Sequence, residues 1–230
     1  MASSNRKKLR IGVMLESVQL SDIMGIDILG NLSSQYMAQV KSFEPSWFVN
    51  HEPHAVDMEF FFIATTLEPG FMTPGLHFVP TVTYDDCPRD LDIIVVGGPA
   101  ISHRPEQADR FMKEAWGKTR VWLTTCVGSM WLASTGLVDG MRCTTNREGL
   151  ELARRLHPKV DWVDQRWVVE EKVFEGDGKG ELWTAGGAGA GIHMIATYCL
   201  ENFNKEFVNT LALRPLEFRL DGNASQFYLD

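Results

Sequence analysis

The chain has 230 residues, of which 44% are hydrophobic and 23% are charged, and its formal net charge is −8. This length and balance fit one large globular domain or at most two small ones, and they exclude a disordered, collagen-like or coiled-coil chain. The acidic charge argues against nucleic acid as a partner, because affinity for a phosphate backbone comes largely from clustered Lys and Arg.

Neither a membrane segment nor a secretion signal is predicted. No apolar run approaches the roughly 18 residues that span a bilayer, and the N-terminus turns from basic to strand-like without a cleavable hydrophobic region. We therefore expect a cytoplasmic chain with no membrane partner. The four cysteines are Cys87, Cys126, Cys143 and Cys199. They form no CxxC pair and have no metal-ligand spacing with histidine, so neither a disulfide scaffold nor a metal site is predicted.

Strand-like and helix-like segments alternate along the chain. In the first half, we expect a strand over 9–15, a helix through 25–40, a strand over 57–65, a hairpin-like excursion over 76–83, a strand over 91–96 and a helix over 105–116. A strand over 119–124 and a helix over 130–137 follow, and then short strands over 142–145, 160–163 and 166–169 with a helix over 147–156 among them. The last elements are a hairpin turn over 175–180 into a strand over 181–185 and a helix over 192–202. Such alternation, with glycine-rich turns after apolar strands, predicts a doubly wound α/β sandwich around a mostly parallel sheet. No linker or repeat divides it. We expect a single domain over 1–230, with 1–8 flexible and 214–230 a C-terminal extension.

The sharpest local signal for chemistry surrounds Cys126. It follows a buried strand and precedes Gly128 and Ser129, which open a helix. A cysteine on such a bend has its sulfur near a helix N-terminus, where unpaired N–H groups favour the nucleophilic thiolate. The same geometry is found in nucleophile elbows, where the next backbone N–H, here that of Val127, stabilises the oxyanion. The alternative is that Cys126 is a small buried residue at a strand end.

The remaining cysteines are predicted to be packing residues. Among the histidines, none follows Cys126 closely. His193 is the best placed, because it opens a helix at the expected edge of the sheet, but a surface or capping role is favoured for it.

A carboxylate offers a better proton partner for the cysteine. Asp22 lies shortly after the first strand, at the edge where ligands bind in α/β proteins, and its neighbours are apolar. Such surroundings raise a carboxyl pKa and suit it to move a proton. Asp22 could instead cap the following helix, and Glu16 and Asp27 are competing carboxylates. The glycine-rich run over 186–191 lacks a nucleotide-binding spacing and indicates close backbone approach to the site.

These segments together resemble a known family. They are RIGVMLESVQLSDIMGIDIL, YDDCPRDLDIIVVGGPA, TTCVGSMWLASTGLVDGMRCTTN and WTAGGAGAGIHM. In order and spacing they are similar to the ThiJ/PfpI superfamily, related to class I glutamine amidotransferases, and within it to the isonitrile hydratase branch. The resemblance implies a flavodoxin-like three-layer sandwich that commonly forms a homodimer, and a site that needs no cofactor.

The resemblance also implies roles for particular residues. Cys126 matches the family nucleophile and Asp22 the catalytic aspartate. Gly98 and Val127 stand where backbone amides line the nucleophile pocket, Ala188 lies in the loop facing it, and His193 stands where an aspartate is usual. Two departures lie near the cysteine. Val127 replaces a hydroxyl residue, or the histidine of the protease-like branch, and Asn146 ends a TTN that replaces a frequent TTH.

The expected activity is a cysteine-dependent lyase reaction on a small organic molecule, by resemblance the hydration of an isonitrile to an N-substituted formamide. Peptidase activity is not expected. Two alternatives remain open: the same two residues could act on another electrophile such as a glyoxal, or in an isomerisation, or the chain could be a non-enzymatic dimeric redox sensor or chaperone-like protein oxidised at Cys126.

Overall fold

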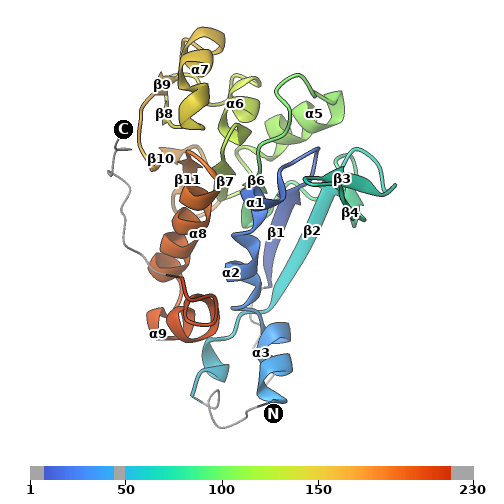
Figure 1. The fold of residues 1–230 in the computed structure, drawn as a ribbon, viewed down its shortest axis with the longest axis vertical. Coiled ribbons are helices and arrows are strands. Elements are labelled where there is room, and N and C mark those ends of the chain that lie inside the picture. Colours follow the sequence, from blue (N-terminus) through green and yellow to red (C-terminus); the bar gives the residue numbers. More distant parts are fainter. Residues whose placement is uncertain (1–7, 44–49, 219–230) are drawn as a thin grey trace.

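The computed structural model describes residues 8–43 and 50–218 (Figure 1). Within them, a central sheet of seven strands has the order β10-β11-β7-β6-β1-β2-β5. Neighbouring strands are parallel, except that β10 is antiparallel to β11. Its strands are β1 (Leu9–Met14), β2 (Met58–Ala64), β5 (Val82–Thr83), β6 (Ile93–Val96), β7 (Val121–Thr125), β10 (Trp167–Lys172) and β11 (Gly180–Ala185). The mostly parallel sheet predicted from the sequence is confirmed.

Two small sheets lie outside the central one. One is the antiparallel hairpin of β3 (Gly70–Met72) and β4 (Leu76–Phe78), and the other pairs β8 (Arg142–Cys143) with β9 (Asp161–Trp162) in parallel. The excursion expected over 76–83 is found only in part, because its first residues form β4 of this hairpin whereas Val82–Thr83 form β5 of the central sheet. The helices are α1 (Leu20–Ile23), α2 (Ile26–Gly30), α3 (Ser34–Lys41), η1 (Glu52–His54), α5 (Glu106–Ala115), α6 (Gly128–Ala133), η2 (Arg147–Gly149), α7 (Leu150–Leu156), α8 (Ala188–Asn202), α9 (Lys205–Val208) and η3 (Asn209–Leu213).

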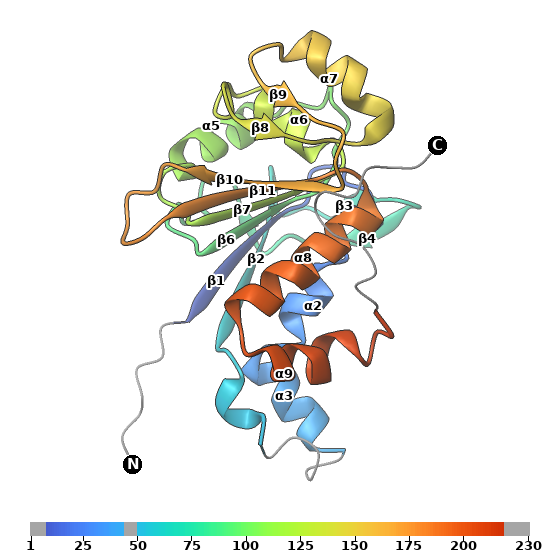
Figure 2. The same ribbon diagram turned by 90° about the vertical axis from the view of Figure 1, so that its left-hand side faces the viewer.

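Helices cover both faces of the sheet (Figure 2). Because side chains alternate along a strand, neighbouring residues enter opposite layers. On β7, Leu123 joins the core beneath α1, α2 and α8, whereas Trp122 joins the core beneath α5 and α6. The two cores make the chain a flavodoxin-like three-layer α/β sandwich, as predicted.

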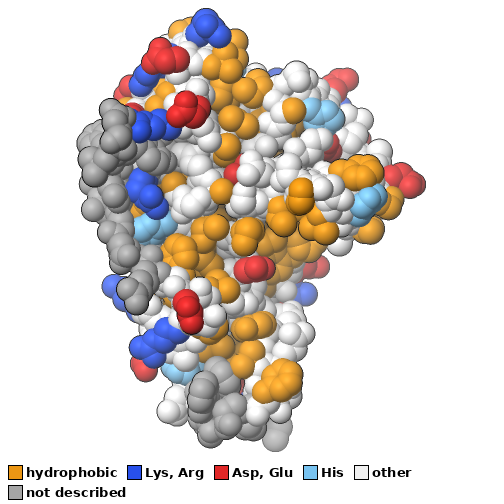
Figure 3. Space-filling view, in the orientation of Figure 1, with side chains coloured by type: hydrophobic (Ala, Val, Ile, Leu, Met, Phe, Trp, Pro, Cys, Tyr) orange, Lys and Arg blue, Asp and Glu red, His pale blue; other side chains and the backbone are white. Residues whose placement is uncertain are grey.

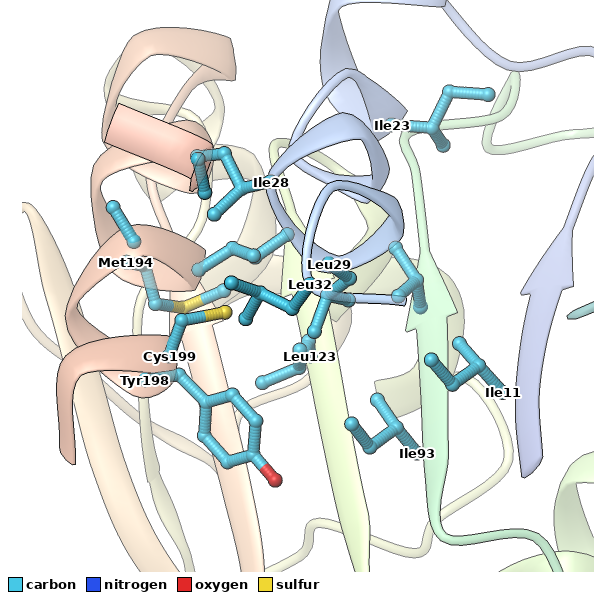
Figure 4. Close-up of a cluster of buried hydrophobic side chains, with 14 of the residues drawn as sticks. Ile11, Ile23, Ile28, Leu29, Leu32, Ile93, Leu123, Met194, Tyr198 and Cys199 are labelled. Atoms are coloured by element: carbon cyan, nitrogen blue, oxygen red, sulfur yellow. The ribbon is translucent and has the colours of Figure 1, made fainter. Parts of the chain in front are cut away.

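The core layer beneath α2 and α8 is closely packed with hydrocarbon side chains and the sulfur atoms of Met194 and Cys199 (Figure 4). Cys199 of α8 is fully buried there, facing Leu29 of α2 and Leu123 of β7. Burial raises the pKa of its thiol well above the usual value. The prediction that Cys199 is a packing residue is confirmed.

The single helix expected through 25–40 is wrong: the segment forms α2 and α3, with a break at Leu32–Ser33. Ser33 has extended backbone angles and pairs with Val56 as an isolated β-bridge. Its side chain accepts a hydrogen bond from the Tyr36 N–H at 3.1 Å and so caps α3. The break exists because the chain pairs here with a segment that is distant in sequence, which the helical spacing does not reveal.

The glycine-rich run after β11 is mostly helical. α8 begins at Ala188, so the expectation of a loop over 186–191 holds only for its first two residues. Gly191 lies where the helix approaches β7, and a Cβ atom there would be 2.4 Å from Thr125 Oγ1 and 2.5 Å from its Cγ2. The close backbone approach predicted for this run is therefore found at Gly191.

The ends of the chain lie largely outside the described residues. Residues 1–7, within the expected flexible start, and residues 219–230, within the expected extension, are not described. Among the helices of residues 8–43 and 50–218, none is long and apolar enough to cross a bilayer.

One face of the molecule carries exposed hydrophobic side chains (Figure 3). Met24 after α1 and Phe71 and Leu76 of the β3–β4 hairpin are 45%, 60% and 49% exposed. Apolar patches are typical of surfaces that bind other chains. The homodimer expected from the sequence remains a prediction.

The contact at Gly191 can be tested against its neighbour in the same helical turn. We expect Gly191→Ala to destabilise the fold by about 1–3 kcal/mol, because the buried, branched Thr125 must move. Gly189→Ala, where a Cβ meets nothing within 4 Å, should be neutral or stabilising by up to about 1 kcal/mol. Urea unfolding of both variants measures the difference. Equal stabilities would contradict the close approach of α8 to β7.

Candidate active site

Cys126 occupies a strained turn between β7 and α6. Its φ angle is 58°, a left-handed conformation that costs a non-glycine residue free energy and is often retained at functional sites. The backbone around it is well bonded. Its N–H donates to the Ala185 carbonyl at 3.0 Å, and its carbonyl accepts from Ser129 Oγ at 3.2 Å and Thr145 Oγ1 at 3.0 Å. The half-buried thiol is thereby held at the carboxyl end of the sheet, on the bend predicted from the sequence.

Asp22 of α1 lies against this thiol. Its side chain is 3% exposed, its Oδ2 accepts a hydrogen bond from the Gly98 N–H at 3.1 Å, and its carboxyl group hydrogen-bonds with Cys126. A Cβ atom at Gly98 would lie only 2.7 Å from Oδ2, so the close approach requires glycine. Asp22 is therefore placed as the sequence predicts, and the alternative role as a helix cap is wrong.

Burial sets the proton affinity of the aspartate. It raises the pKa of Asp22 from 3.8 to about 6, and the hydrogen bonds from Gly98 and Cys126 oppose this rise only in part. A carboxyl group with such a pKa is ionised at neutral pH yet accepts a proton more readily than an exposed aspartate. The raised pKa predicted from the apolar neighbours is confirmed.

The thiol of Cys126 also has a raised pKa, contrary to the expectation of a thiolate favoured by the helix N-terminus. The causes are burial and then the negative charge of Asp22. Hydrogen bonds from the Val127 N–H and the Asn146 side chain act in the opposite direction. Removing a charge from water and placing it beside a carboxylate outweighs two N–H donors. The thiol thus holds its proton at rest.

Asn146 is a site residue whose role sequence reasoning missed. Its Nδ2 lies 3.4 Å from Cys126 Sγ, and it comes from the segment after β8. That segment is fixed at the sheet edge because the Thr144 N–H donates to Thr184 Oγ1 at 2.9 Å. The only signal in the sequence was the asparagine that ends the TTN motif.

The other predicted pocket residues have different outcomes. Gly98 and Val127 both direct backbone N–H groups into the site, Gly98 to Asp22 and Val127 to the sulfur. Ala188 is the half-buried first residue of α8 rather than a loop residue. Contact between Ala188 and the substrate stays a prediction.

His193 is neither a surface nor a capping residue. It lies within α8, is 4% exposed, and its Nδ1 accepts a hydrogen bond from the Arg166 guanidinium at 3.0 Å. Its ring packs on Trp167, with 4.8 Å between ring centroids, and edge-on against Phe218. The imidazole therefore belongs to the packing between α8 and β10. Its expected contact with substrate stays a prediction.

The competing carboxylates are engaged elsewhere or exposed. Glu16 accepts hydrogen bonds from the N–H and hydroxyl of Thr65 and pairs with His103 Nε2 at 2.8 Å. Asp27 is exposed on α2.

Cys87 and Cys143 are buried, and burial raises the pKa of each thiol to about 12, so both are packing residues as predicted. In the described part of the chain, no three His, Cys, Asp or Glu side chains gather as metal ligands.

The fold and the site define an α/β sandwich protein with a cysteine on a nucleophile elbow and a buried carboxyl group beside it. The chain belongs to the DJ-1/PfpI family, whose model matches residues 34–197. The matched range contains Cys126 and Asn146 and begins after Asp22.

Individual relatives agree with this assignment. The chain is 30% identical over 148 residues to an isonitrile hydratase of Pseudomonas putida, an alignment covering 63% of this chain and 60% of that protein. The chain thus matches less than two thirds of that relative's length. A ThiJ/PfpI family protein of Pseudomonas syringae superposes with a TM-score of 0.70 at 18% identity, over 94% of this chain and 76% of that one. Drosophila melanogaster DJ-1beta gives 0.63 at 15% identity, over 92% and 99%. These two structures share the fold.

Asp22 should make stability depend on pH. Its folded pKa is above the unfolded value, so the folded chain binds this proton more tightly, and stability falls as the pH rises from about 4 through about 6. Asp22→Asn keeps an acceptor for Gly98 and removes the buried charge. We expect it to be more stable than the parent chain by about 1–2 kcal/mol at pH 7.5, with no gain at pH 4.

Denaturant unfolding at the two pH values checks this expectation, with Asp27→Asn on the exposed side of α2 as the control. A gain for Asp22→Asn that is the same at both pH values would show that the charge of Asp22 is not its cause.

Proposed function

We propose that this protein is a cofactor-independent hydro-lyase that adds water to an isonitrile and releases an N-substituted formamide. The observation that carries the proposal is that the buried Asp22 carboxyl group and the half-buried Cys126 side chain meet at Gly98, where a Cβ atom would lie 2.7 Å from Asp22 Oδ2 and 3.3 Å from Cys126 Cβ. A nucleophile and a carboxyl group with a pKa near neutrality suffice for covalent addition followed by hydration. The similarity to an isonitrile hydratase supports the choice of substrate.

The first half of the reaction forms a covalent adduct. The Asp22 carboxylate takes the thiol proton, and the Cys126 sulfur uses its electron pair to form a bond with the terminal isonitrile carbon. That carbon then carries the negative charge and takes the proton back from Asp22. The product is a thioimidate in which sulfur, carbon and nitrogen are linked, and Asp22 is again a carboxylate.

The second half releases the product. Asp22 takes a proton from water as the hydroxide adds to the thioimidate carbon, and the nitrogen takes that proton. The carbon–sulfur bond then breaks, the hydroxyl proton passes through Asp22 to the departing sulfur, and the formamide leaves. Each proton that Asp22 accepts is given up in the same half-reaction, so the enzyme returns to its starting state.

The local structure disfavours the alternative of a redox sensor. Cysteines that sense oxidants are usually thiolates with a lowered pKa, whereas burial and the Asp22 charge raise the pKa of Cys126. Reaction with another small electrophile, such as a 2-oxoaldehyde, would use the same two residues. Turnover assays with each substrate distinguish this reaction from isonitrile hydration.

Turnover is tested with an alkyl isonitrile, following formamide by mass spectrometry. We expect the parent chain to produce formamide, and both Cys126→Ser and Asp22→Asn to lose at least about 1,000-fold in kcat, because each removes a group that the covalent path requires. Ser134→Ala, at the C-terminal end of α6, is the control for folding. Formamide formation that survives both substitutions would contradict the assigned roles. Turnover of 2-oxoaldehydes but not isonitriles would replace the substrate.

The pH dependence of the reaction follows from the same pair. Because Asp22 must be ionised to take the thiol proton, we expect kcat/KM to rise tenfold per pH unit below about pH 6 and to level off above it. The midpoint belongs to the coupled Asp22–Cys126 pair rather than to one residue. Rates measured between pH 4.5 and 8 check this. A rate that is constant across that range would contradict proton transfer to Asp22.

A further inference from the structure

Within residues 8–43 and 50–218, three polar groups interact with the sulfur of Cys126, and one of them exchanges protons near neutral pH. The Val127 N–H and the Asn146 Nδ2 are donors, and the Asp22 carboxyl group is the acid or base. An amide neither gains nor loses a proton in this range. This site therefore differs from a thiol beside an imidazole. A single imidazole could both take the thiol proton and stabilise the negative charge on the sulfur.

The orientation of the Asn146 amide is fixed by its own oxygen. Oδ1 accepts a hydrogen bond from the Glu148 N–H at 3.1 Å, which caps η2. An amide bonded in this way must turn its Nδ2 hydrogens away from the helix end, and here they meet Cys126 Sγ at 3.4 Å. The neighbouring Thr145 hydroxyl bonds the Cys126 carbonyl, so the amide and the sulfur are held to each other at two points. The donor is in place before any substrate binds.

We infer that Asn146 stabilises the negative charge on the Cys126 sulfur during the reaction. Its Nδ2–H donates to the sulfur while the sulfur is a thiolate, and Asp22 is the group that moves every proton. The inference takes its reaction from the proposed function. When Asp22 takes the thiol proton, one negative charge passes from the carboxylate to the sulfur. Asn146 keeps its own protons and stabilises that charge. It does so again when the carbon–sulfur bond breaks and the sulfur leaves with its electron pair.

This arrangement restricts the substrate. Because Asp22 is the one proton carrier, it must give the proton that it takes from the sulfur to the substrate before it can take a second proton. Reactions that suit the site are additions to a neutral electrophile whose adduct itself needs that proton, as an isonitrile carbon does.

The test removes the donor in two ways, with an added negative charge in Asn146→Asp and without one in Asn146→Ala. Asn146→Asp keeps the oxygen that caps η2 and exchanges the N–H donor for an acceptor, whereas Asn204→Asp makes the same substitution at the cap of α9, where Oδ1 accepts from the Phe207 N–H at 3.0 Å. The first readout is the rate of iodoacetamide alkylation of Cys126 against pH, followed by peptide mass spectrometry. It reports the thiolate without any assumption about the substrate, and the buried Cys87, Cys143 and Cys199 serve as internal references.

We expect Asn146→Asp to move the midpoint of alkylation upward by about one pH unit or more and to lower kcat on the isonitrile by about 10- to 100-fold, with a smaller change in KM. Asn146→Ala should move the midpoint in the same direction by less. Asn204→Asp should match the parent chain in both measurements. A midpoint and a kcat that are unchanged in Asn146→Asp would overturn the inference.

The two proposals fail in different ways. If the parent chain does not turn over isonitriles while the alkylation midpoint still rises in the Asn146 variants, the proposed reaction is wrong and the role of Asn146 at the sulfur stands. If isonitriles are turned over and the midpoint does not move, the reaction stands and Asn146 is a structural cap of η2.

Discussion

The proposed chemistry depends on placing a half-buried cysteine sulfur beside a buried carboxyl group. Burial raises the pKa of both groups, the charge of Asp22 raises the pKa of Cys126 further, and the hydrogen bond from Cys126 acts to lower the pKa of Asp22. The proton therefore lies on the thiol at rest, and contributions from N–H donors oppose these shifts only in part. Gly98, Val127 and Asn146 supply those contributions.

The fold accepts two local costs to make this contact. One is the left-handed backbone of Cys126, which is held by hydrogen bonds from the side chains of Ser129 and Thr145 to its carbonyl. The other is the buried charge of Asp22, which is offset only in part by the Gly98 N–H. Costs of this kind are usual at functional sites. Here the two costs fall on Cys126 and Asp22, which is a physical reason to place the reaction at these two residues.

Parallel strands explain how four separate segments reach one point. The carboxyl ends of β1, β6, β7 and β11 lie side by side in the sheet, so the chain that leaves each strand starts at the same edge. Asp22 follows β1, Gly98 follows β6 and Cys126 follows β7. Asn146 reaches this edge in another way, through the bond of Thr144 to Thr184 on β11. The family match begins after Asp22, so the acid is contributed by a part of the chain that the family model does not cover.

The sequence by itself determined the layered α/β fold, the elbow at Cys126 and the choice of Asp22, because apolar strand periodicity and glycine placement are local signals that survive in one dimension. Tertiary structure decided the rest. It raised the pKa of the Cys126 thiol, broke the segment over 25–40 at Ser33, buried His193 against Trp167 and brought the Asn146 amide to the sulfur. Each of these outcomes is set by a neighbour distant in sequence, since burial, charge and hydrogen bonding act through space rather than along the chain.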